Sequence, residues 1–220
     1  TSVARTPGRN PSQPALIRGG ARRDSESLAP SPDKGKTGEG FLSAIHAIQS
    51  GGVIAYPTEA VYGLGCNPAD LSAVQRILTL KQRPTDKGLI LVAADLAQLE
   101  PYLLPLDNAL LERILPTWPG PVTWLLPVRP GVSPLIRGNH DTLAVRVTAH
   151  PVCRKLCQQL GHPLISTSAN LSDQPPARSA QEVRQQFGAQ LDDILDAPLG
   201  EQAQPTEIRH GLTGEIVRPA

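Results

Sequence analysis

Several features are scarce in this 220-residue chain, and each scarcity narrows the range of functions. Basic and acidic side chains nearly cancel, at 21 against 20, which excludes the strong positive excess of a histone-like or ribosomal-type protein. Only two Trp, three Tyr and two Phe are present, too few for a platform that stacks single-stranded bases. No apolar run approaches the roughly 18 residues that span a bilayer. The sequence therefore predicts a soluble protein with no membrane contact.

Cysteine is also scarce, because only Cys66, Cys153 and Cys157 are present. An odd, small number argues against a disulfide-framed secreted scaffold and favours a reducing compartment, so we expect a cytoplasmic protein. Cys153 and Cys157 lie four apart on an expected helix, but His150 and His162 are spaced too loosely to complete a zinc set. We therefore predict no protein-held metal site.

The first 40 residues differ in composition from the rest of the chain. They contain five Pro, six Gly and five Ser, and Leu16-Ile17 is their one adjacent pair of bulky aliphatic residues. Such a composition buries too little apolar surface to offset the entropy of ordering the chain. We interpret residues 1–40 as a flexible tail and residues 41–220 as a single domain.

Within residues 41–220 the apolar pattern alternates between helical and extended periods. The mixed order of elements is not a strict βα repeat, so we predict an α/β fold built on one twisted mixed sheet flanked by helices. Asp70 and Ser179 are expected helix N-caps, the second within a capping box with Glu182. The expected helices are 41–50, 70–81, a stretch after Asp95, 110–115, 150–160 and 179–187, and the expected strands are 53–56, 88–93, 122–128, 143–147, 163–166, 193–195, 207–209 and 215–218.

Three apolar stretches run directly into small polar residues, at 56–65, 118–123 and 163–170. In open α/β sheets ligands bind where strand ends bring hydroxyl, amide and backbone N–H groups together. The alternative is that each segment is only a tight turn with local side-chain-to-backbone hydrogen bonds.

Positive charge gathers at Lys81-Gln82-Arg83-Pro84, with Lys87 shortly after. Pro84 blocks further helix, which keeps Lys81 and Arg83 together near a helix end. Such charges suit a polyphosphate, with Arg as a bidentate fork and Lys as a compact charge. The alternative is the ordinary stabilising placement of cations at a helix C-terminus.

Taken together, six segments resemble the YrdC/Sua5 family in order and spacing, and the likeness is greatest to its short bacterial form. The resemblance spans about residues 41–220 and implies a YrdC-like fold with a concave ligand cavity. Asn170-Leu171-Ser172 is followed by Asp173 where the family usually has glycine, and we expect Asp173 to face solvent. The segments are Tyr56-Pro57-Thr58-Glu59-Ala60-Val61-Tyr62-Gly63-Leu64-Gly65-Cys66, Lys81-Gln82-Arg83-Pro84, Lys87-Gly88-Leu89-Ile90, Pro119-Gly120-Pro121-Val122-Thr123, Leu143-Ala144-Val145-Arg146-Val147 and Ser166-Thr167-Ser168-Ala169-Asn170.

The resemblance implies a nucleotidyltransferase. L-threonine and bicarbonate or CO₂ would form a carbamate, which would attack the α-phosphorus of ATP to give L-threonylcarbamoyl-AMP and pyrophosphate. Mg²⁺ would accompany the ATP. Partner proteins would then transfer the threonylcarbamoyl group to N6 of adenosine 37 in tRNA, and direct tRNA contact is possible in principle.

The same resemblance implies roles for individual residues. A reaction between anions needs positive charge and positioning more than a protein nucleophile. Cys66 follows the first segment and is expected beside the pocket, without a paired base. The implied catalytic residues are Lys81, Arg83, Ser168 and Asn170; Thr58 and Arg146 are expected to bind threonine, with Arg146 as the fork for its carboxylate; and Lys81, Arg83, Lys87, Thr123, Ser166, Ser168 and Asn170 are expected to contact the nucleotide.

Two other functions stay open from the sequence. One is a non-catalytic module that binds double-stranded RNA or tRNA, which the balanced charge and few aromatic residues disfavour. The other is a carbamoyl-adenylate enzyme like the related domain of hydrogenase-maturation proteins, which carry additional domains. Dependence of pyrophosphate release on threonine would separate these functions from a threonylcarbamoyl-AMP synthase.

Overall fold

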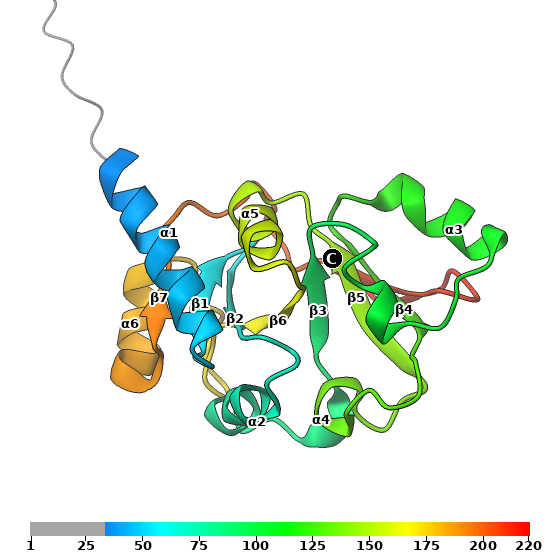
Figure 1. Ribbon diagram of the computed structural model, residues 1–220, viewed down its shortest axis with the longest axis horizontal. Helices are drawn as coiled ribbons and strands as arrows, with labels where there is room; N and C mark the ends of the chain where they lie inside the picture. Colours follow the sequence, from blue (N-terminus) through cyan, green and yellow to red (C-terminus); the bar gives the residue numbers. More distant parts are fainter. Residues whose placement is uncertain (1–33) are drawn as a thin grey trace, which may run out of the picture. The chain divides into compact units, whose positions relative to one another are not determined.

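The computed structural model describes residues 34–220 (Figure 1). Helix α1 spans Lys34–Gln49. It therefore begins seven positions before Phe41, and residues 34–40 belong to the first helix instead of a tail. The expectation of a flexible tail otherwise falls on residues 1–33, which lie outside the described residues. No helix in the described part of the chain is both long enough and apolar enough to cross a bilayer.

The described residues form one mixed, nine-stranded sheet with the order β7-β1-β2-β6-β3-β5-β4-β8-β9. The pairs β1–β7, β3–β5 and β4–β8 are parallel and the other neighbouring pairs are antiparallel. The predicted α/β class is therefore confirmed. The strands are β1 (Ile54–Pro57), β2 (Tyr62–Gly65), β3 (Ile90–Ala93), β4 (Val122–Pro127), β5 (Thr142–Val147), β6 (Leu164–Ser168), β7 (Asp193–Ile194), β8 (Glu207–His210) and β9 (Ile216–Arg218).

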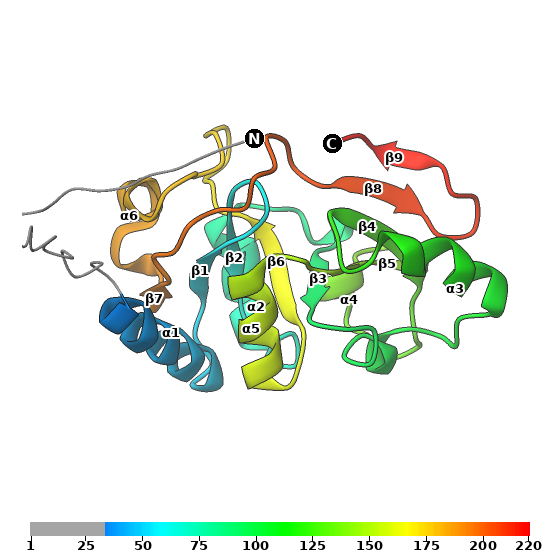
Figure 2. The ribbon, with the colours of Figure 1, turned by 90° about the horizontal axis from the view of Figure 1, so that it is seen from above.

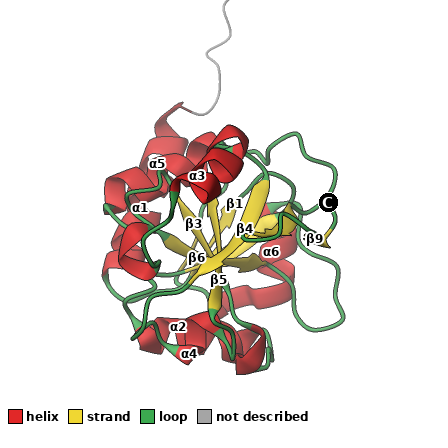
Figure 3. Ribbon diagram, turned by 90° about the vertical axis from the view of Figure 1, so that its right-hand side faces the viewer, coloured by secondary structure: helices red, strands yellow, loops and turns green. Residues whose placement is uncertain are grey.

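Helices lie on both faces of this sheet. Helices α1 and α5 cover one face, and α2 and α4 lie against the opposite face (Figures 1 and 3). Each face has its own apolar core, and the core beneath α1 and α5 includes Phe41, Ile48 and Leu156. The remaining helices are α2 (Leu71–Leu80), α3 (Asn108–Ile114), α4 (Pro134–Arg137), α5 (Pro151–Leu160) and α6 (Ala180–Phe187).

Local capping explains where the predicted helices begin. The carboxylate of Asp70 accepts hydrogen bonds from the backbone N–H groups of Ser72 and Ala73, and the Ser179 hydroxyl accepts one from Glu182. Each bond satisfies a donor that the first helical turn leaves unpaired. Both predicted N-caps are therefore confirmed.

Two local expectations are wrong. The stretch after Asp95 forms only the short 3₁₀ turn Glu100–Tyr102. Strand β2 was not expected, since Gly63 and Gly65 are unusual in strands. A Cβ at Gly65 would lie 2.5 Å from Cε1 of Tyr56, so the glycine leaves room for that ring.

The strands change character along the face that α1 and α5 share. Side chains two apart on a strand point to the same face, so Leu164 and Ser166 share it. Register pairs Leu164 with Val92 and Ser166 with Ile90. The part of the face under the helices is built by Ile54, Val92 and Leu164, which we call the covered half. Beyond it lies the open half, built by Gly63, Ile90, Ser166 and Ser168.

Candidate functional site

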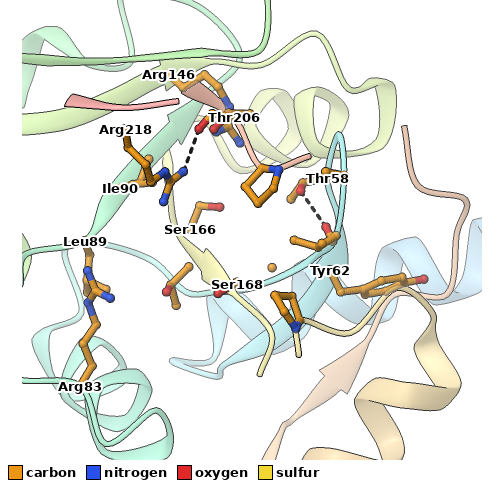
Figure 4. Close-up of a pocket in the computed structure, with 16 residues that line it drawn as sticks. Thr58, Tyr62, Arg83, Leu89, Ile90, Arg146, Ser166, Ser168, Thr206 and Arg218 are labelled. Carbon is orange, nitrogen blue, oxygen red and sulfur yellow. Dashed lines mark hydrogen bonds between the residues drawn. The ribbon is translucent and has the colours of Figure 1, made fainter. Parts of the chain in front are cut away.

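The open half of the sheet face forms the floor of a cavity of about 180 Å³. Strands β2, β3, β5 and β6 contribute to it, together with the β1–β2 turn and the segment that leads to β8. Figure 4 shows side chains from these separate elements pointing into a common space. The lining residues are Thr58, Ala60, Val61, Tyr62, Gly63, Arg83, Leu89, Ile90, Arg146, Ser166, Thr167, Ser168, Pro176, Pro205, Thr206 and Arg218.

Small residues keep the floor of this cavity open. A Cβ at Gly63 would lie 3.3 Å from Cγ2 of Thr58 and 3.5 Å from the Ser166 hydroxyl, so a side chain there would occupy the cavity. Thr58 is held in the β1–β2 turn, because both its N–H and its hydroxyl donate to the carbonyl of Val61, at 3.1 and 2.7 Å. The predicted residues Thr58 and Ser166 therefore line one cavity.

Arg146 lies at the boundary between the covered and open halves and is only 4% exposed. Its Nη1 donates to the hydroxyls of Thr123 and Thr206, at 3.2 and 2.7 Å, and its Nη2 donates to Glu59 at 3.1 Å. A guanidinium has five N–H donors. The three bonds leave two of them, and the buried Nε has no hydrogen-bond partner among the described residues.

This arrangement corrects the expectation for Thr123. The residue is fully buried and does not line the cavity. Its hydroxyl bonds Arg146 and lies 3.3 Å from that of Thr206. Thr123 therefore supports Arg146 from β4, and in this structure it presents no group to a nucleotide.

Two more arginines reach the cavity from distant parts of the chain. Arg83 follows α2, and its Nε donates to the carbonyl of Gly88 at 3.1 Å. Arg218 lies on β9, and its Nη2 donates to the carbonyl of Thr206 at 2.8 Å (Figure 4). Among the described residues, neither arginine forms an ion pair with a carboxylate. The site therefore carries uncompensated positive charge.

The electrostatics of Arg218 reflect this crowding of charge. Partial burial, and then repulsion from Arg146 and Arg83, hold the pKa of Arg218 below its ordinary value. Like charges that are brought together raise the free energy of the empty site, and a bound anion reverses that effect. The cavity is therefore built for a negatively charged ligand.

The end of α2 explains how Lys81 and Arg83 come to point differently. Gln82 adopts the left-handed conformation at φ 47°. The N–H of Gln82 then donates to the carbonyl of Thr79 and that of Arg83 donates to Leu78, as in a Schellman motif. The helix ends between Lys81 and Arg83 as predicted, but Gln82 turns the chain before Pro84 is reached.

Lys81 is held by hydrogen bonds within the protein. Its ammonium donates to the carbonyls of Ser168 and Asn170, at 2.6 and 2.9 Å, and to Oδ1 of Asn170 at 2.9 Å. An ammonium has three donors, so all of them are used by the protein. Burial, and then the charge of Arg83, lower the pKa of Lys81 to about 8. Lys81 therefore fixes the 168–170 segment, and only its charge remains available to a ligand.

The same network engages the side chain of Asn170. Its Oδ1 also accepts from the Ser168 hydroxyl at 2.7 Å, and its Nδ2 donates to the carbonyls of Leu171 and Gln174. Ser168 and Arg83 border both the cavity and a second hollow of about 290 Å³, which Lys81, the exposed Lys87 and Asn170 also line. The two hollows are thus neighbours, and the predicted cationic residues surround the second.

The segment 195–206 connects β7 to β8 and closes one side of the cavity. Figure 2 shows it running from β7 on one side of the sheet to β8 on the other. The Tyr62 hydroxyl donates to the carbonyl of Ala197 at 2.8 Å, and Nε2 of His150 lies 3.2 Å from the carbonyl of Pro198. Burial lowers the pKa of His150, and its Nδ1 accepts the backbone N–H of Cys153, which leaves Nε2–H as the donor to Pro198. At the other end, Thr206 bonds Arg146.

Sequence reasoning missed several residues of the site. Glu59 and Tyr62 lie inside a segment that was singled out, but no spacing rule indicates which of its side chains turn inward. Thr206 and Arg218 come from the last fifteen residues, and only the pairing of β8 with β4 brings them to the cavity. Cys66 was expected beside the pocket and is instead buried in the core on the opposite face, where burial raises the pKa of its thiol to about 12. Asp173 is exposed, as expected.

Comparison with known proteins identifies the family. A family described as telomere recombination and named for Sua5, YciO and YrdC matches residues 46–220. The chain belongs to the Sua5/YciO/YrdC family. A threonylcarbamoyl-AMP synthase from Nitrosococcus oceani is 56% identical over 175 residues, which are 80% of this chain and 95% of that protein. One from Idiomarina loihiensis is 55% identical over 179 residues, with the same two shares.

Solved structures of the family have the same fold. P. abyssi Sua5 complexed with L-threonine is 35% identical with a TM-score of 0.73, over 77% of this chain and 50% of that one. This chain therefore spans about half the length of that Sua5. E. coli YciO is 29% identical with a TM-score of 0.71, over 81% of this chain and 88% of that one. The YrdC-like fold expected from the sequence is thus confirmed.

Proposed function

We propose that the protein is a threonylcarbamoyl-AMP synthase. It converts L-threonine, bicarbonate or CO₂, and ATP into L-threonylcarbamoyl-AMP and pyrophosphate. The observation that carries the proposal is the cavity, where three guanidinium groups converge and only one is ion paired. The identity to synthases over nearly their whole length supports the same reaction.

The chemistry requires neutralised charge and fixed geometry. Threonine and bicarbonate condense to an N-carboxylate with loss of water, and an oxygen of that carboxylate forms a bond to the α-phosphorus of ATP. The bond from the α-phosphorus to the β-phosphate oxygen breaks, and its electron pair leaves with pyrophosphate. The carbamate and ATP that react with each other are both anions, so positive groups that stabilise charge in the transition state are the main contribution of the protein.

Arg146 is the residue we assign to the threonine carboxylate. Its buried Nε and one Nη2 hydrogen are left after the bonds to Thr123, Thr206 and Glu59. Two donors of one guanidinium match the two oxygens of a carboxylate. Thr58 lines the same cavity and supplies a further polar contact for threonine.

The polyphosphate is assigned to the second hollow and to its boundary with the cavity. Arg83 borders both spaces, so it can contact the phosphate at which the reaction occurs. Lys87 is exposed and adds charge, and Ser168 lies at the boundary of the two hollows, where its hydroxyl donates to Asn170. Lys81 and Asn170 act by shaping the 168–170 segment, since their polar groups are already bonded.

Mg²⁺ is proposed as a companion of ATP and not as a resident ion of the protein. Across the described residues, no three His, Cys, Asp or Glu side chains lie close enough together to hold a metal ion. Both oxygens of Glu59 already accept hydrogen bonds, from Arg146 and Thr148. The chain's own residues therefore do not fit a metal site, and the triphosphate itself supplies the oxygen ligands that Mg²⁺ prefers.

The product defines the partners that we propose. A carbamoyl adenylate is a reactive mixed anhydride, so it is consumed by acyl transfer to an amine. We assign that step to tRNA-modifying partner proteins that act on N6 of adenosine 37, in the cytoplasm. A direct contact of this chain with the tRNA belongs to the same proposal.

The test is a reconstituted reaction with ATP, Mg²⁺, bicarbonate and L-threonine. Pyrophosphate release and an adenylate whose mass includes threonine are both expected by mass spectrometry, and both are expected to disappear when threonine is omitted. Arg154→Ala removes an exposed arginine of α5 and serves as the control for a general loss of positive charge. Pyrophosphate release that is indifferent to threonine would contradict the proposal.

A substitution at Arg146 assigns the threonine end of the site. Arg146→Lys keeps the charge but loses the fork, so we expect the threonine KM to rise by about tenfold or more while the ATP KM changes little. Steady-state kinetics with each substrate varied in turn provide the measurement. A selective rise in the ATP KM would assign Arg146 to the nucleotide instead.

A further inference from the structure

Among the described residues, Glu59 is the carboxylate that pairs with an arginine of the cavity, at a site that is otherwise built for anions. Its side chain is only 8% exposed, and the residue is not among those that line the cavity. Oε2 accepts from Nη2 of Arg146 at 3.1 Å and Oε1 accepts from the Thr148 hydroxyl at 2.6 Å. A negative charge next to an anion site weakens binding unless it serves another purpose. The role of Glu59 therefore depends on the groups to which it is hydrogen bonded, above all the guanidinium of Arg146.

The backbone around Glu59 excludes water from this ion pair. Gly200 packs so closely that a Cβ there would lie 2.8 Å from Cα of Glu59. The N–H of Gln202 donates to the carbonyl of Glu59 at 3.1 Å, and that of Gly200 donates to Thr58 at 3.0 Å. Segment 195–206 therefore covers Glu59. Ionic hydrogen bonds are stronger where water is excluded.

Arg146 is consequently held from three sides. Glu59 binds it from the β1–β2 turn, Thr123 from β4, and Thr206 from the segment that covers the site. A long arginine side chain has many rotamers, and fixing it in advance lowers the entropy lost when a ligand binds. Of its three partners Glu59 alone is charged, so it contributes most to the fixed orientation.

We infer that Glu59 is a positioning residue, which orients Arg146 so that its two remaining N–H donors meet the carboxylate of the amino-acid substrate. Glu59 does not touch that substrate. The inference rests on the proposed function, in which threonine binds at Arg146. It assigns to the acidic residue of the β1–β2 turn a role in selecting an amino acid with a free carboxylate.

The sign of one effect distinguishes positioning from simple charge compensation. In Glu59→Gln the guanidinium loses its counter-charge but keeps a neighbour of the same shape. If Glu59 only reduced the net positive charge of the site, an anionic ligand would bind the Glu59→Gln variant more tightly. If Glu59 positions Arg146, the freed guanidinium leaves its orientation and threonine binds more weakly, with a rise of about tenfold or more in its KM and Kd. The ATP KM is expected to stay within about twofold, since ATP does not depend on this fork.

A pair of more conservative variants tests the same hydrogen-bond network at Thr148, on the other side of Glu59 from Arg146. Thr148→Val removes the hydroxyl that holds Oε1 of Glu59, and Thr148→Ser keeps it. We expect Thr148→Val to raise the threonine KM by about two- to tenfold and Thr148→Ser to restore it. This pair carries the test if Glu59→Gln does not fold, because no buried charge loses its ionic partner.

The control is an ion pair away from the cavity. Asp192 accepts from Arg76 and from the backbone N–H of Val53, so Asp192→Asn weakens an ion pair that is more exposed than that of Glu59. We expect it to lower the thermal unfolding temperature and to leave the threonine KM unchanged. Threonine binding to each folded variant is measured by calorimetry alongside turnover.

The outcomes distinguish failure of the proposed function from failure of the positioning role of Glu59. A wild-type protein that makes no threonine-dependent adenylate would overturn the proposed function. A wild-type protein that is active, with a threonine KM that is unchanged or lower in Glu59→Gln, would overturn the positioning role alone. Equal rises in the threonine and ATP KM values in Glu59→Gln or Thr148→Val would also overturn it, since they indicate a general distortion.

Discussion

The covered and open halves of the sheet face share strands β3 and β6, yet one half buries apolar side chains and the other exposes polar groups to a cavity. In the covered half, Ile54, Val92 and Leu164 are buried against α1 and α5. In the open half, two residues further along the same strand, Leu164 gives way to Ser166 and Ser168. One strand therefore serves as core at one end and as cavity floor at the other. The helices stabilise the fold without touching the chemistry, and the cavity keeps donors that the fold does not use.

The largest expected effect comes from breaking the covered half. Leu164 is fully buried, so Leu164→Ala leaves a cavity and should lower the free energy of unfolding by about 2–5 kcal/mol. Below the lowered unfolding temperature, the KM values should match the wild type, since the side chain lies on the helix side of the face. Urea unfolding and steady-state kinetics measure the two quantities. Leu212→Ala, at a position 61% exposed, is the control and should change stability by less than about 0.5 kcal/mol. An altered threonine KM in Leu164→Ala would show that the two halves are coupled.

In the open half we expect a substitution to reduce activity without reducing stability. Arg83→Ala removes a cation that borders both hollows, and a charge-assisted contact to phosphate contributes about 1.5–3 kcal/mol, or roughly 10- to 150-fold. We expect that loss to be divided between kcat and the ATP KM, with an unchanged unfolding temperature, because Arg83 belongs to neither apolar core. Arg154→Ala again provides the control. A fully active Arg83→Ala would leave that residue with only a structural role at the end of α2.

The same comparison explains what the sequence could and could not predict. The helices follow from periodicity and caps, which are local, and those capped by Asp70 and Ser179 were predicted correctly. Thr58, Arg83, Arg146 and Ser166 were also placed in the site, but through the resemblance to a family. The bonding of each donor depends on register between strands far apart in sequence. For that reason the hydrogen bonds that hold Lys81 and Thr123 within the protein could not be predicted, and Arg218, Glu59 and Thr206 were missed.

The titration of Lys81 is expected to change stability and activity by an intermediate amount. Because its pKa is lowered to about 8, the unfolded state binds more protons than the folded state between about pH 8 and the ordinary value of 10.5. Stability from this group therefore rises with pH in that window. Activity should fall through the same window, since the neutral amine no longer supplies charge and has only two N–H donors for its three acceptors in the 168–170 segment. Between pH 7 and 10.5, measured kcat/KM should fall as pH rises, while the contribution of Lys81 to the unfolding temperature should increase.

A variant without a titrating group checks the source of that divergence. Lys81→Arg keeps a positive charge throughout, so whatever activity it retains should show no decline near pH 8. A decline that persists in Lys81→Arg would point to another group, or to the substrate, as its origin.

The smallest effect is expected where the open half ends, at Asp173. This residue is exposed and adopts the left-handed conformation at φ 63°, which glycine adopts at a lower cost than aspartate. Asp173→Gly removes backbone strain but increases the entropy of the unfolded chain, so a net gain in stability below about 1 kcal/mol is expected. Asp173→Asn provides the matched control, because asparagine tolerates the same backbone and removes only the charge. Since the carboxylate faces solvent, neither variant should change the ATP KM. A lower ATP KM in both variants would show that the charge of Asp173 repels the nucleotide, and a lower value in Asp173→Gly alone would assign the effect to the backbone.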